Sequence, residues 1–477
     1  MRDFVKSFFF FGLAVSIEKI ISFFLLPLYT HYFKTYEFGV IDLIQVSISI
    51  LSIFALLQLE TALQRYYYEY EGYEKKKMLS TIIIIIIFLS LLLSGILCLF
   101  AKHISLILFD QEQYYRLIQL ASLQLTFSNF TMLGFLILRY EKKNMSFLIL
   151  MSIKVVITLS CTLFFVVSLK KGINGVFYAQ FIGLMISSIL VFFAVNKFLV
   201  FDFSNIICRK SMQYALPQFP ARIGSALLSY ANRYFMVGYL TVSAIGLFSL
   251  SLKLASIIQF LEMSFVMAWA PFMHEQQKNK NHKAVFVQVL LLVASPVFFL
   301  VCVISLFSKE LVQVISSSNF VDSYKYVGGL SLYFSLFIFK EIVDIGPKFL
   351  EKTKYLSYTF VLTLIVNLIS LYLLIEPFGL YGVVYSMIIT NVFLLSLSWF
   401  VSNKIYYIPH RIWMFLIIAF PAFSLSVSLM YSLPTLFIRF LILMAVCIFY
   451  SVIFIINIKS FLKQKRESIL ITEIITK

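Results

Sequence analysis

Long apolar segments recur along the whole chain and are separated by short polar loops, which carry most of the charged residues. A segment of about 18 residues or more, at roughly 1.5 Å per residue, is long enough to cross the hydrocarbon layer of a membrane. The pattern predicts an all-α polytopic membrane protein with about fourteen spans. Their approximate ranges are 7–30, 38–60, 79–100, 115–138, 146–169, 175–196, 213–238, 245–271, 285–307, 326–346, 355–375, 379–402, 412–431 and 435–457.

An internal repeat divides these spans. The apolar stretches 175–197 and 382–404 both close on Asn-Lys at an offset of 207 residues, and the same offset relates Gly39 to Gly246. Each copy holds six helices, an even number, so we expect two lobes of equal orientation related by a pseudo-two-fold axis along the membrane normal. The predicted domains are an N-terminal lobe (1–200), a C-terminal lobe (201–405) and a final helix pair with a basic tail (406–477). Such duplication is typical of transporters.

Composition excludes a water-soluble globule, since 61% of the residues are hydrophobic and only 13% are charged. The net charge of +17 follows membrane topology: a cytoplasmic N-terminus places 25 Lys and Arg on the cytoplasmic side against seven opposite. We therefore expect both termini in the cytoplasm and no nucleic-acid partner. The five cysteines and five histidines lack metal-ligand spacing, so we expect neither a metal nor another cofactor.

Charged side chains inside the spans are the main site candidates, because each costs roughly 2.5–3.5 kcal/mol at a helix centre unless it faces water or a partner. Arg222 and Arg233 are eleven residues apart and share one helix face with Ser225 and Ser229. Guanidinium groups are well suited to phosphate oxygens, so this face is a candidate substrate site. The alternative is that each arginine pairs with an acid on a neighbouring helix and only braces the bundle.

Polar residues also line one face of two other predicted spans, the second and the fourth. Asp42, Gln45, Ser49 and Ser52 recur on one face of the second span, and Glu60 returns to it. We add Lys253 and Lys340 to the substrate-binding candidates. The candidates for a polar cavity wall or for coupling to H⁺ or Na⁺ are Asp42, Gln45, Glu60, Glu262, Glu341 and Asp344.

Two local patterns have more than one interpretation. In the fourth span, Gln119, Ser122, Thr126 and Asn129 could bind sugar hydroxyls or hold helices together, and we favour the structural role. In the tenth span, Lys340 and Asp344 lie one turn apart and are expected to neutralise each other, which would leave Glu341 as a freer acid.

The segment YALPQFPARIGSALLSYANRYFMVGYLTVSAIGLFSLSLKLA combines a tyrosine, a proline-rich helix start, an arginine, a glycine step and a lysine. These positions are Tyr214, Pro217, Pro220, Arg233, Gly246 and Lys253. The pattern resembles the middle segment of the polysaccharide-export flippases, which share the multidrug/oligosaccharidyl-lipid/polysaccharide (MOP) superfamily with the multidrug and toxin extrusion (MATE) proteins. Asn232 replaces the acid that precedes the arginine in that family, which leaves open whether Arg233 has a nearby acid.

The resemblance implies two six-helix lobes around a central cavity. It also implies a flippase that carries a polyprenyl-diphosphate-linked oligosaccharide, such as an O-antigen or capsule repeat unit, from the cytoplasmic to the outer leaflet of a bacterial inner membrane. By analogy with lipid II flippases, the last two helices are expected to hold the lipid tail. Membrane lipids and other polysaccharide-assembly proteins are the expected partners.

Three rival functions stay open, one of which is a scaffold of the polysaccharide-assembly complex without transport of its own. A MATE-like exporter of organic cations should favour acids and aromatic residues in its cavity rather than arginines. A membrane oligosaccharide polymerase or glycosyltransferase should carry a sizeable external loop or an acidic loop motif. The arginines of the span 213–238 argue against the cation exporter, and the sequence has neither the loop nor the motif expected of the enzyme.

Overall fold

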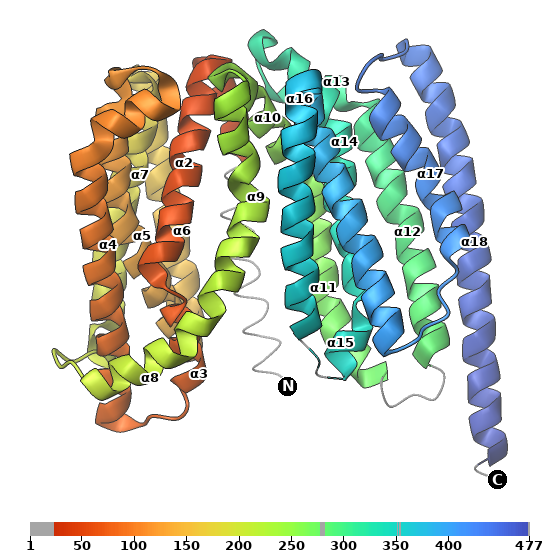
Figure 1. Ribbon diagram of the computed structural model, residues 1–477, viewed down its shortest axis with the longest axis horizontal. Helices are drawn as coiled ribbons and strands as arrows, with labels where there is room; N and C mark the ends of the chain where they lie inside the picture. Colours follow the sequence, from red (N-terminus) through yellow and green to blue (C-terminus); the bar gives the residue numbers. More distant parts are fainter. Residues whose placement is uncertain (1–22, 277–281, 351, 353, 476–477) are drawn as a thin grey trace. The chain divides into compact units, whose positions relative to one another are not determined.

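The computed structural model describes residues 23–276, 282–350, 352 and 354–475, drawn as ribbons in Figure 1. These residues are almost entirely helical and include no β-strand. By length and composition, nine of the described helices are able to cross a membrane, or ten if the bent pair α10 (Val242–Ala255) and α11 (Ile257–Gln276) forms one span. The all-helical membrane fold is therefore confirmed. The expected first span, 7–30, lies largely outside the described residues. The described chain begins with a helical segment over 23–32.

Packing divides the described residues into two compact units. The first contains residues up to 237 together with 241–246, and the second contains 238–240 and 247 onwards. The lobe boundaries expected near residues 200 and 405 follow the internal repeat and remain a prediction.

The first unit is built around a core of apolar side chains from consecutive helices, among them Leu63, Ile82 and Leu133. Its α-helices are α2 (Thr35–Leu56), α3 (Leu59–Tyr66), α4 (Gly72–Phe109), α5 (Tyr115–Tyr140), α6 (Asn144–Thr162), α7 (Gly172–Val195), α8 (Asn205–Ala215) and α9 (Phe219–Tyr239). Short segments join them: η1 (Glu112–Tyr114), η2 (Leu163–Ser168), η3 (Asn196–Phe198) and η4 (Leu216–Gln218).

The second span ends earlier than the apolar pattern indicated. Leu57 and Gln58 have left-handed backbone angles, with φ of 47° and 62°, so the chain turns between α2 and α3. Glu60, expected at the end of the span, is therefore the second residue of α3.

Helix α9 docks on α2 at three levels within the first unit. Phe54 and Phe219 meet edge to face with ring centroids 5.5 Å apart, and the hydroxyls of Ser47 and Tyr234 are 2.9 Å apart. Near the start of α2, Asp42 pairs with Arg233. Because the start of α9 meets the end of α2, and the later part of α9 meets the middle and first half of α2, the two helices run antiparallel.

Two repeat-related glycines pack against each other. A Cβ atom on Gly39 would lie 2.1 Å from the carbonyl oxygen of Val242, and one on Gly246 would lie 1.9 Å from that of Thr35. The contact is reciprocal, since Thr35 and Val242 also differ by 207 residues. Only glycine permits so close an approach of two helix backbones, so equivalent positions of the two copies meet here.

The second unit contains residues 238–240, the part of α10 from Leu247 onward and the elements that follow it. Its further elements are α11, α12 (His282–Leu306), α13 (Ser308–Ile315), η5 (Ser318–Ser323), α14 (Tyr324–Val343), α15 (Ile345–Phe349), α16 (Lys354–Ile405), α17 (Ile412–Ser428) and α18 (Leu436–Ile475). Arg439 of α18 donates to both carboxylate oxygens of Glu310 at 2.7 Å, and the Tyr450 hydroxyl donates to the Ile418 carbonyl at 2.8 Å. These contacts attach the last helix to α13 and α17.

One expected span of this region differs from the structure. The expected helix 245–271 breaks at Ser256, where α10 and α11 meet at 42°. The Ser256 hydroxyl donates to the Lys253 carbonyl at 2.7 Å and so competes with the helix ladder. The expected boundary between the helices 355–375 and 379–402 is confirmed, because α16 consists of two helices that meet in a kink at Gly379, whose φ of 57° glycine adopts without strain.

Candidate functional site

A cavity of about 300 Å³ lies between α2, α5 and α9 inside the first unit, and we call it the Arg222 cavity. It is lined by Ile48, Ser49, Ser52, Ile53, Leu56, Leu125, Ser128, Arg222, Ser225, Ala226, Ser229 and Tyr230. Arg222 is the only charged side chain in this lining, and five serines supply most of its polarity. Three of the expected site residues, Arg222, Ser225 and Ser229, therefore meet here with two serines of α2.

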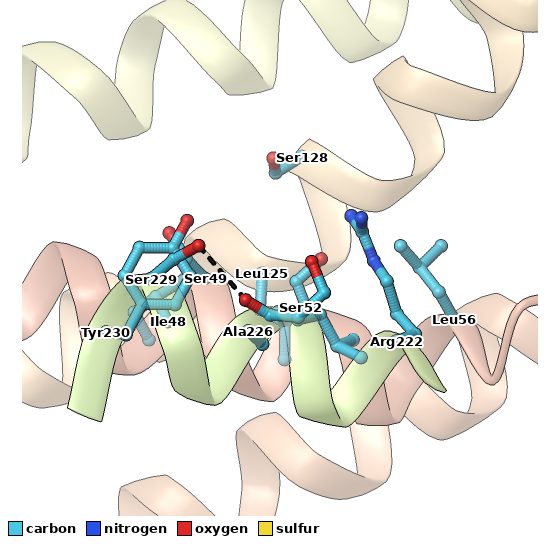
Figure 2. Close-up of a pocket in the computed structure, with 12 residues that line it drawn as sticks. Ile48, Ser49, Ser52, Leu56, Leu125, Ser128, Arg222, Ala226, Ser229 and Tyr230 are labelled. Atoms are coloured by element: carbon cyan, nitrogen blue, oxygen red, sulfur yellow. Dashed lines mark hydrogen bonds between the residues drawn. The ribbon is translucent and has the colours of Figure 1, made fainter. Parts of the chain in front are cut away.

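Arg222 faces the cavity without a direct partner. Figure 2 shows its guanidinium projecting from α9 into the cavity, between the side chains of Ser128 and Leu56. The residue is exposed, and within the described ranges its side chain forms neither a hydrogen bond nor an ion pair. Its five N–H donors are free to bind an anion.

Three serines of the cavity donate their hydroxyl protons to other protein groups. Ser49 and Ser229 donate to the backbone carbonyl four residues earlier, at 2.8 and 3.0 Å, and Figure 2 marks the bond of Ser229. Ser52 donates to the Asn129 side chain at 2.6 Å. Because their protons are engaged, these three hydroxyls offer lone pairs, which accept hydrogen bonds from ligand hydroxyls.

Arg233, eleven residues further along α9, has the opposite surroundings. Its guanidinium is buried, with Nε 3.4 Å from the Asp42 carboxylate, and Nη1 donates to the Ser229 carbonyl at 2.9 Å and to Asn232 Oδ1 at 3.0 Å. Asp42 therefore supplies the acid that the Asn232 replacement had left in doubt. For this arginine the contacts are those of the bracing alternative.

Glu60 is an acid that lies within electrostatic range of Arg222. The Glu60 carboxylate is close enough for an electrostatic interaction with Arg222, but the two do not form an ion pair. Its Oε2 atom is buried and has no hydrogen-bond partner in the described part of the chain. Glu60 therefore stands beside the cavity as a weakly coupled counter-charge.

In the second unit, the expected residues Lys340, Glu341 and Asp344 form one ion-pair cluster with Lys348. Lys340 Nζ lies 2.9 Å from Asp344 and 3.0 Å from Glu341, and Lys348 Nζ lies 2.7 Å from Glu341. The predicted Lys340–Asp344 pair is confirmed. The expectation that Glu341 is a freer acid is wrong, because two ammonium groups hold it.

The remaining candidates do not join the Arg222 cavity. Gln45 is half-buried on α2, and its carbonyl accepts the Ser49 hydroxyl. Lys253 is half-buried in the last turn of α10, and Glu262 is half-buried on α11. None of these three lines the cavity.

The polar seam of α5 holds helices together, as favoured from the sequence. Asn129 donates to Ser90 at 2.9 Å while it accepts from Ser52, and Ser94 donates to the Ser122 carbonyl at 2.5 Å. These bonds join α5 to α2 and α4.

A second cavity, of about 440 Å³, was missed by the sequence reasoning, and we call it the Arg139 cavity. It is lined by Gln64, Ser128, Thr131, Met132, Phe135, Leu136, Arg139, Phe147, Met151, Lys154 and Leu184. The signal was present: Ser128, Thr131, Phe135 and Arg139 recur on one face of α5. Arg139 had been counted with the following loop.

Comparison with known proteins identifies a family for the sequence and similar structures for the fold. A family described as polysaccharide biosynthesis protein matches residues 4–277, more than half of the chain. A comparison with curated protein sequences found no match.

Among solved structures, lipid II flippase MurJ in an inward closed conformation has a TM-score of 0.70 at 17% identity, over 94% of this chain and 99% of that one. An inward-facing multidrug resistance MATE family transporter of the MOP superfamily has a TM-score of 0.63 at 13% identity, over 81% and 94%. A point mutant of the Vibrio cholerae MATE transporter VcmN has a TM-score of 0.58 at 14% identity, over 84% and 96%. The chain therefore has the fold shared by these transporters.

Proposed function

Because the chain belongs to the polysaccharide biosynthesis protein family, we propose that it is a flippase for a polyprenyl-diphosphate-linked oligosaccharide. The observation that carries the proposal is the unpaired Arg222 guanidinium in a serine-lined cavity. Such a cation is costly inside a membrane, roughly 2.5–3.5 kcal/mol at a helix centre, and a phosphate ligand or water offsets that cost.

The donor and acceptor pattern of the cavity fits a phosphorylated sugar. Arg222 donates to phosphate oxygens, and a planar guanidinium does so through two parallel hydrogen bonds. Ser49, Ser52 and Ser229 accept from sugar hydroxyls, since their own protons are engaged. In this assignment Arg233 positions α9 through its ion pair with Asp42, and Arg222 contacts the headgroup.

Transport follows by alternating access of the two lobes, with the lipid tail remaining in the bilayer. The tail is assigned to the region of α17 and α18, whose counterparts in the related lipid II flippases are expected to hold it. Export of a dianionic headgroup from a cell with a negative interior gains about 4–5 kcal/mol per 100 mV, since each charge contributes roughly 2.3 kcal/mol. Coupling to H⁺ or Na⁺ through Asp42, Glu60 or Glu262 is a further element of the proposal.

The membrane assignment is the bacterial inner membrane with both termini in the cytoplasm. Its support is the excess of basic residues in alternate loops, including Lys75, Lys76 and Lys77 before the apolar part of α4. Labelling of single cysteines from outside intact cells tests this topology. A cysteine at position 76 should stay protected until the cells are permeabilised.

The Arg222 cavity argues against a MATE-like exporter of organic cations. A cation would meet a guanidinium there and no carboxylate in the lining, and like charges in a low-dielectric site repel strongly. An acidic headgroup meets a favourable field in the same place.

The test is flipping of a fluorescent short-chain polyprenyl diphosphate disaccharide in proteoliposomes, read by quenching of the outer leaflet. We expect Arg222→Gln to lower the rate about tenfold or more, as the loss of a charge-assisted hydrogen bond implies. Arg209→Gln is the matched control, since Arg209 is exposed on α8 and lines neither cavity. Wild-type flipping by Arg222→Gln, or transport of tetraphenylphosphonium instead of the lipid, would overturn the assignment.

A further inference from the structure

The Arg139 cavity follows one face of α5 from the middle of the helix to its last turn. Its α5 residues are Ser128, Thr131, Met132, Phe135, Leu136 and Arg139, the spacing of a single helical stripe. Ser128 and Arg139 are eleven residues apart, a rise of about 16 Å. The predicted topology places the Arg139 end on the cytoplasmic side, where cargo enters.

The lining of the cavity contains two basic side chains and no carboxylate. Arg139 and Lys154 are the charged residues of the lining. Arg139 is exposed, and its side chain forms no hydrogen bond or ion pair within the described ranges. The acid nearest in sequence, Glu141, is engaged by Lys75 Nζ at 2.8 Å and by the Tyr67 hydroxyl. The Arg139 guanidinium therefore remains available to a ligand.

The other walls suit a sugar. Gln64 accepts the Tyr140 hydroxyl through Oε1 at 3.4 Å, which leaves its amide N–H groups as donors. Phe135 and Phe147 form an edge-to-face pair with centroids 5.3 Å apart, and they present an apolar surface for C–H groups. About 440 Å³ falls within the usual range of 300–1,000 Å³ for ligand pockets with few polar anchors.

The two cavities adjoin at Ser128, which lines both. A cargo that occupies both would have its diphosphate beside Arg222 and another part of the molecule beyond Ser128. The two phosphates of a diphosphate share one bridging oxygen and stay together at Arg222. An anionic group at Arg139 must then belong to another part of the cargo.

We propose that the Arg139 cavity binds an acidic sugar of the oligosaccharide, whose carboxylate pairs with the Arg139 guanidinium. This inference rests on the proposed flippase function and narrows its substrate class to glycans that contain a uronic acid or a similar acidic residue. Gln64 and Thr131 contact the hydroxyls of that sugar.

The experiment uses the purified full chain in nanodiscs and two synthetic probes that differ in one group. Both are short-chain polyprenyl diphosphates with a disaccharide, which ends in glucuronic acid in one probe and in glucose in the other. For the wild type we expect the acidic probe to bind about tenfold or more tightly. Arg139→Gln should reduce this preference to within twofold and leave the glucose probe unchanged, whereas Arg222→Gln should weaken both probes.

Arg116→Gln is the matched control, because Arg116 lies on α5 at its opposite end and lines neither cavity. It should keep the full preference, and unchanged binding of the glucose probe shows that Arg139→Gln is folded. Equal binding of both probes by the wild type, or a preference retained by Arg139→Gln, would overturn the inference but not the flippase. Failure of the wild type to bind either probe would overturn the proposed function itself.

A lipid headgroup is the other source of an anion at this site. The measurement is therefore repeated in nanodiscs of phosphatidylcholine alone and with phosphatidylglycerol added. If the effect of Arg139→Gln occurs only with phosphatidylglycerol, the site binds lipid and the acidic-sugar inference fails. The same loss of preference in both lipids supports it.

Discussion

Arg222 and Arg233 lie on the same face of one helix, yet the two ends of α9 place them in contrasting surroundings. Arg233 is 5% exposed and held by Asp42, Asn232 and the Ser229 carbonyl. Arg222 is exposed to a cavity and has no direct partner within the described ranges. The same residue type on the same stripe is therefore a brace at one end and a candidate ligand site at the other.

The difference shows that the opposite helix decides the role of an intramembrane arginine. At the level of Arg233, α2 presents the carboxylate of Asp42, and at the level of Arg222 it presents Ser52 and Leu56. Lys340 of the second unit falls on the bracing side, since Glu341 and Asp344 hold it. A direct ion pair thus distinguishes the braced cations Arg233 and Lys340 from Arg222, the candidate ligand site.

The largest expected effect comes from breaking the buried pair. Arg233→Gln leaves the Asp42 carboxylate buried without its partner, which typically costs about 3–5 kcal/mol. We expect a much lower melting temperature and yield of folded protein in detergent, measured by thermal unfolding and size-exclusion chromatography. Arg222→Gln should leave the melting temperature almost unchanged.

The double variant Asp42→Asn with Arg233→Gln tests whether the stability lost in Arg233→Gln comes from the unpaired charge of Asp42. Removing both charges should recover much of the lost stability, because no uncompensated charge remains. Additive losses from the two single variants would show that Asp42 and Arg233 act independently, contrary to the ion pair.

A smaller effect should follow from adding an acid at Asn232, where the related flippases carry one. Arg233 already has one carboxylate, so Asn232→Asp gives the buried group a net negative charge. Part of that cost is offset by a stronger hydrogen bond, and we expect about 1–2 kcal/mol of destabilisation at neutral pH. The comparison with Asn232→Ala, which removes the hydrogen bond without adding charge, isolates the charge. A gain in stability with Asn232→Asp would mean that Asp42 does not neutralise Arg233.

The contrast between the arginines was only partly predictable from the sequence. The eleven-residue spacing placed Arg222 and Arg233 on one face, since helix geometry is local. Which acid meets which arginine depends on Asp42, 191 residues from Arg233, and on the register of α9 against α2. No single-helix pattern contains that register.

The fold shows the same limit. The lengths and hydropathy of the spans were readable, and the all-helical membrane fold is confirmed. The breaks were not, because Leu57 and Gln58 adopt left-handed angles without glycine and the Ser256 side chain competes at the bend. The Arg139 cavity was missed because a charged residue at a helix end usually belongs to the loop.

At the cavity end of the comparison, Arg222→Lys distinguishes charge from shape. Lysine keeps the positive charge but loses the planar fork that binds a phosphate through two bonds. We expect the diphosphate probe to bind about three- to tenfold more weakly, measured in nanodiscs, with no change in melting temperature. Wild-type affinity for Arg222→Lys would show that a point charge suffices.

The smallest expected effect concerns the counter-charge beside Arg222. Glu60 lies within electrostatic range of Arg222 but does not form an ion pair with it, and its buried Oε2 has no hydrogen-bond partner in the described chain. Partly exposed charge pairs are worth up to about 1 kcal/mol, so Glu60→Gln should tighten binding of the diphosphate probe at most about fivefold. Glu69→Gln is the control, because Glu69 pairs with Arg65 and Lys210 away from both cavities. If Glu60→Gln weakens binding instead, Glu60 orients Arg222 toward the cargo rather than competing with it, and an acid of α3 would then brace the cavity end of α9 as well.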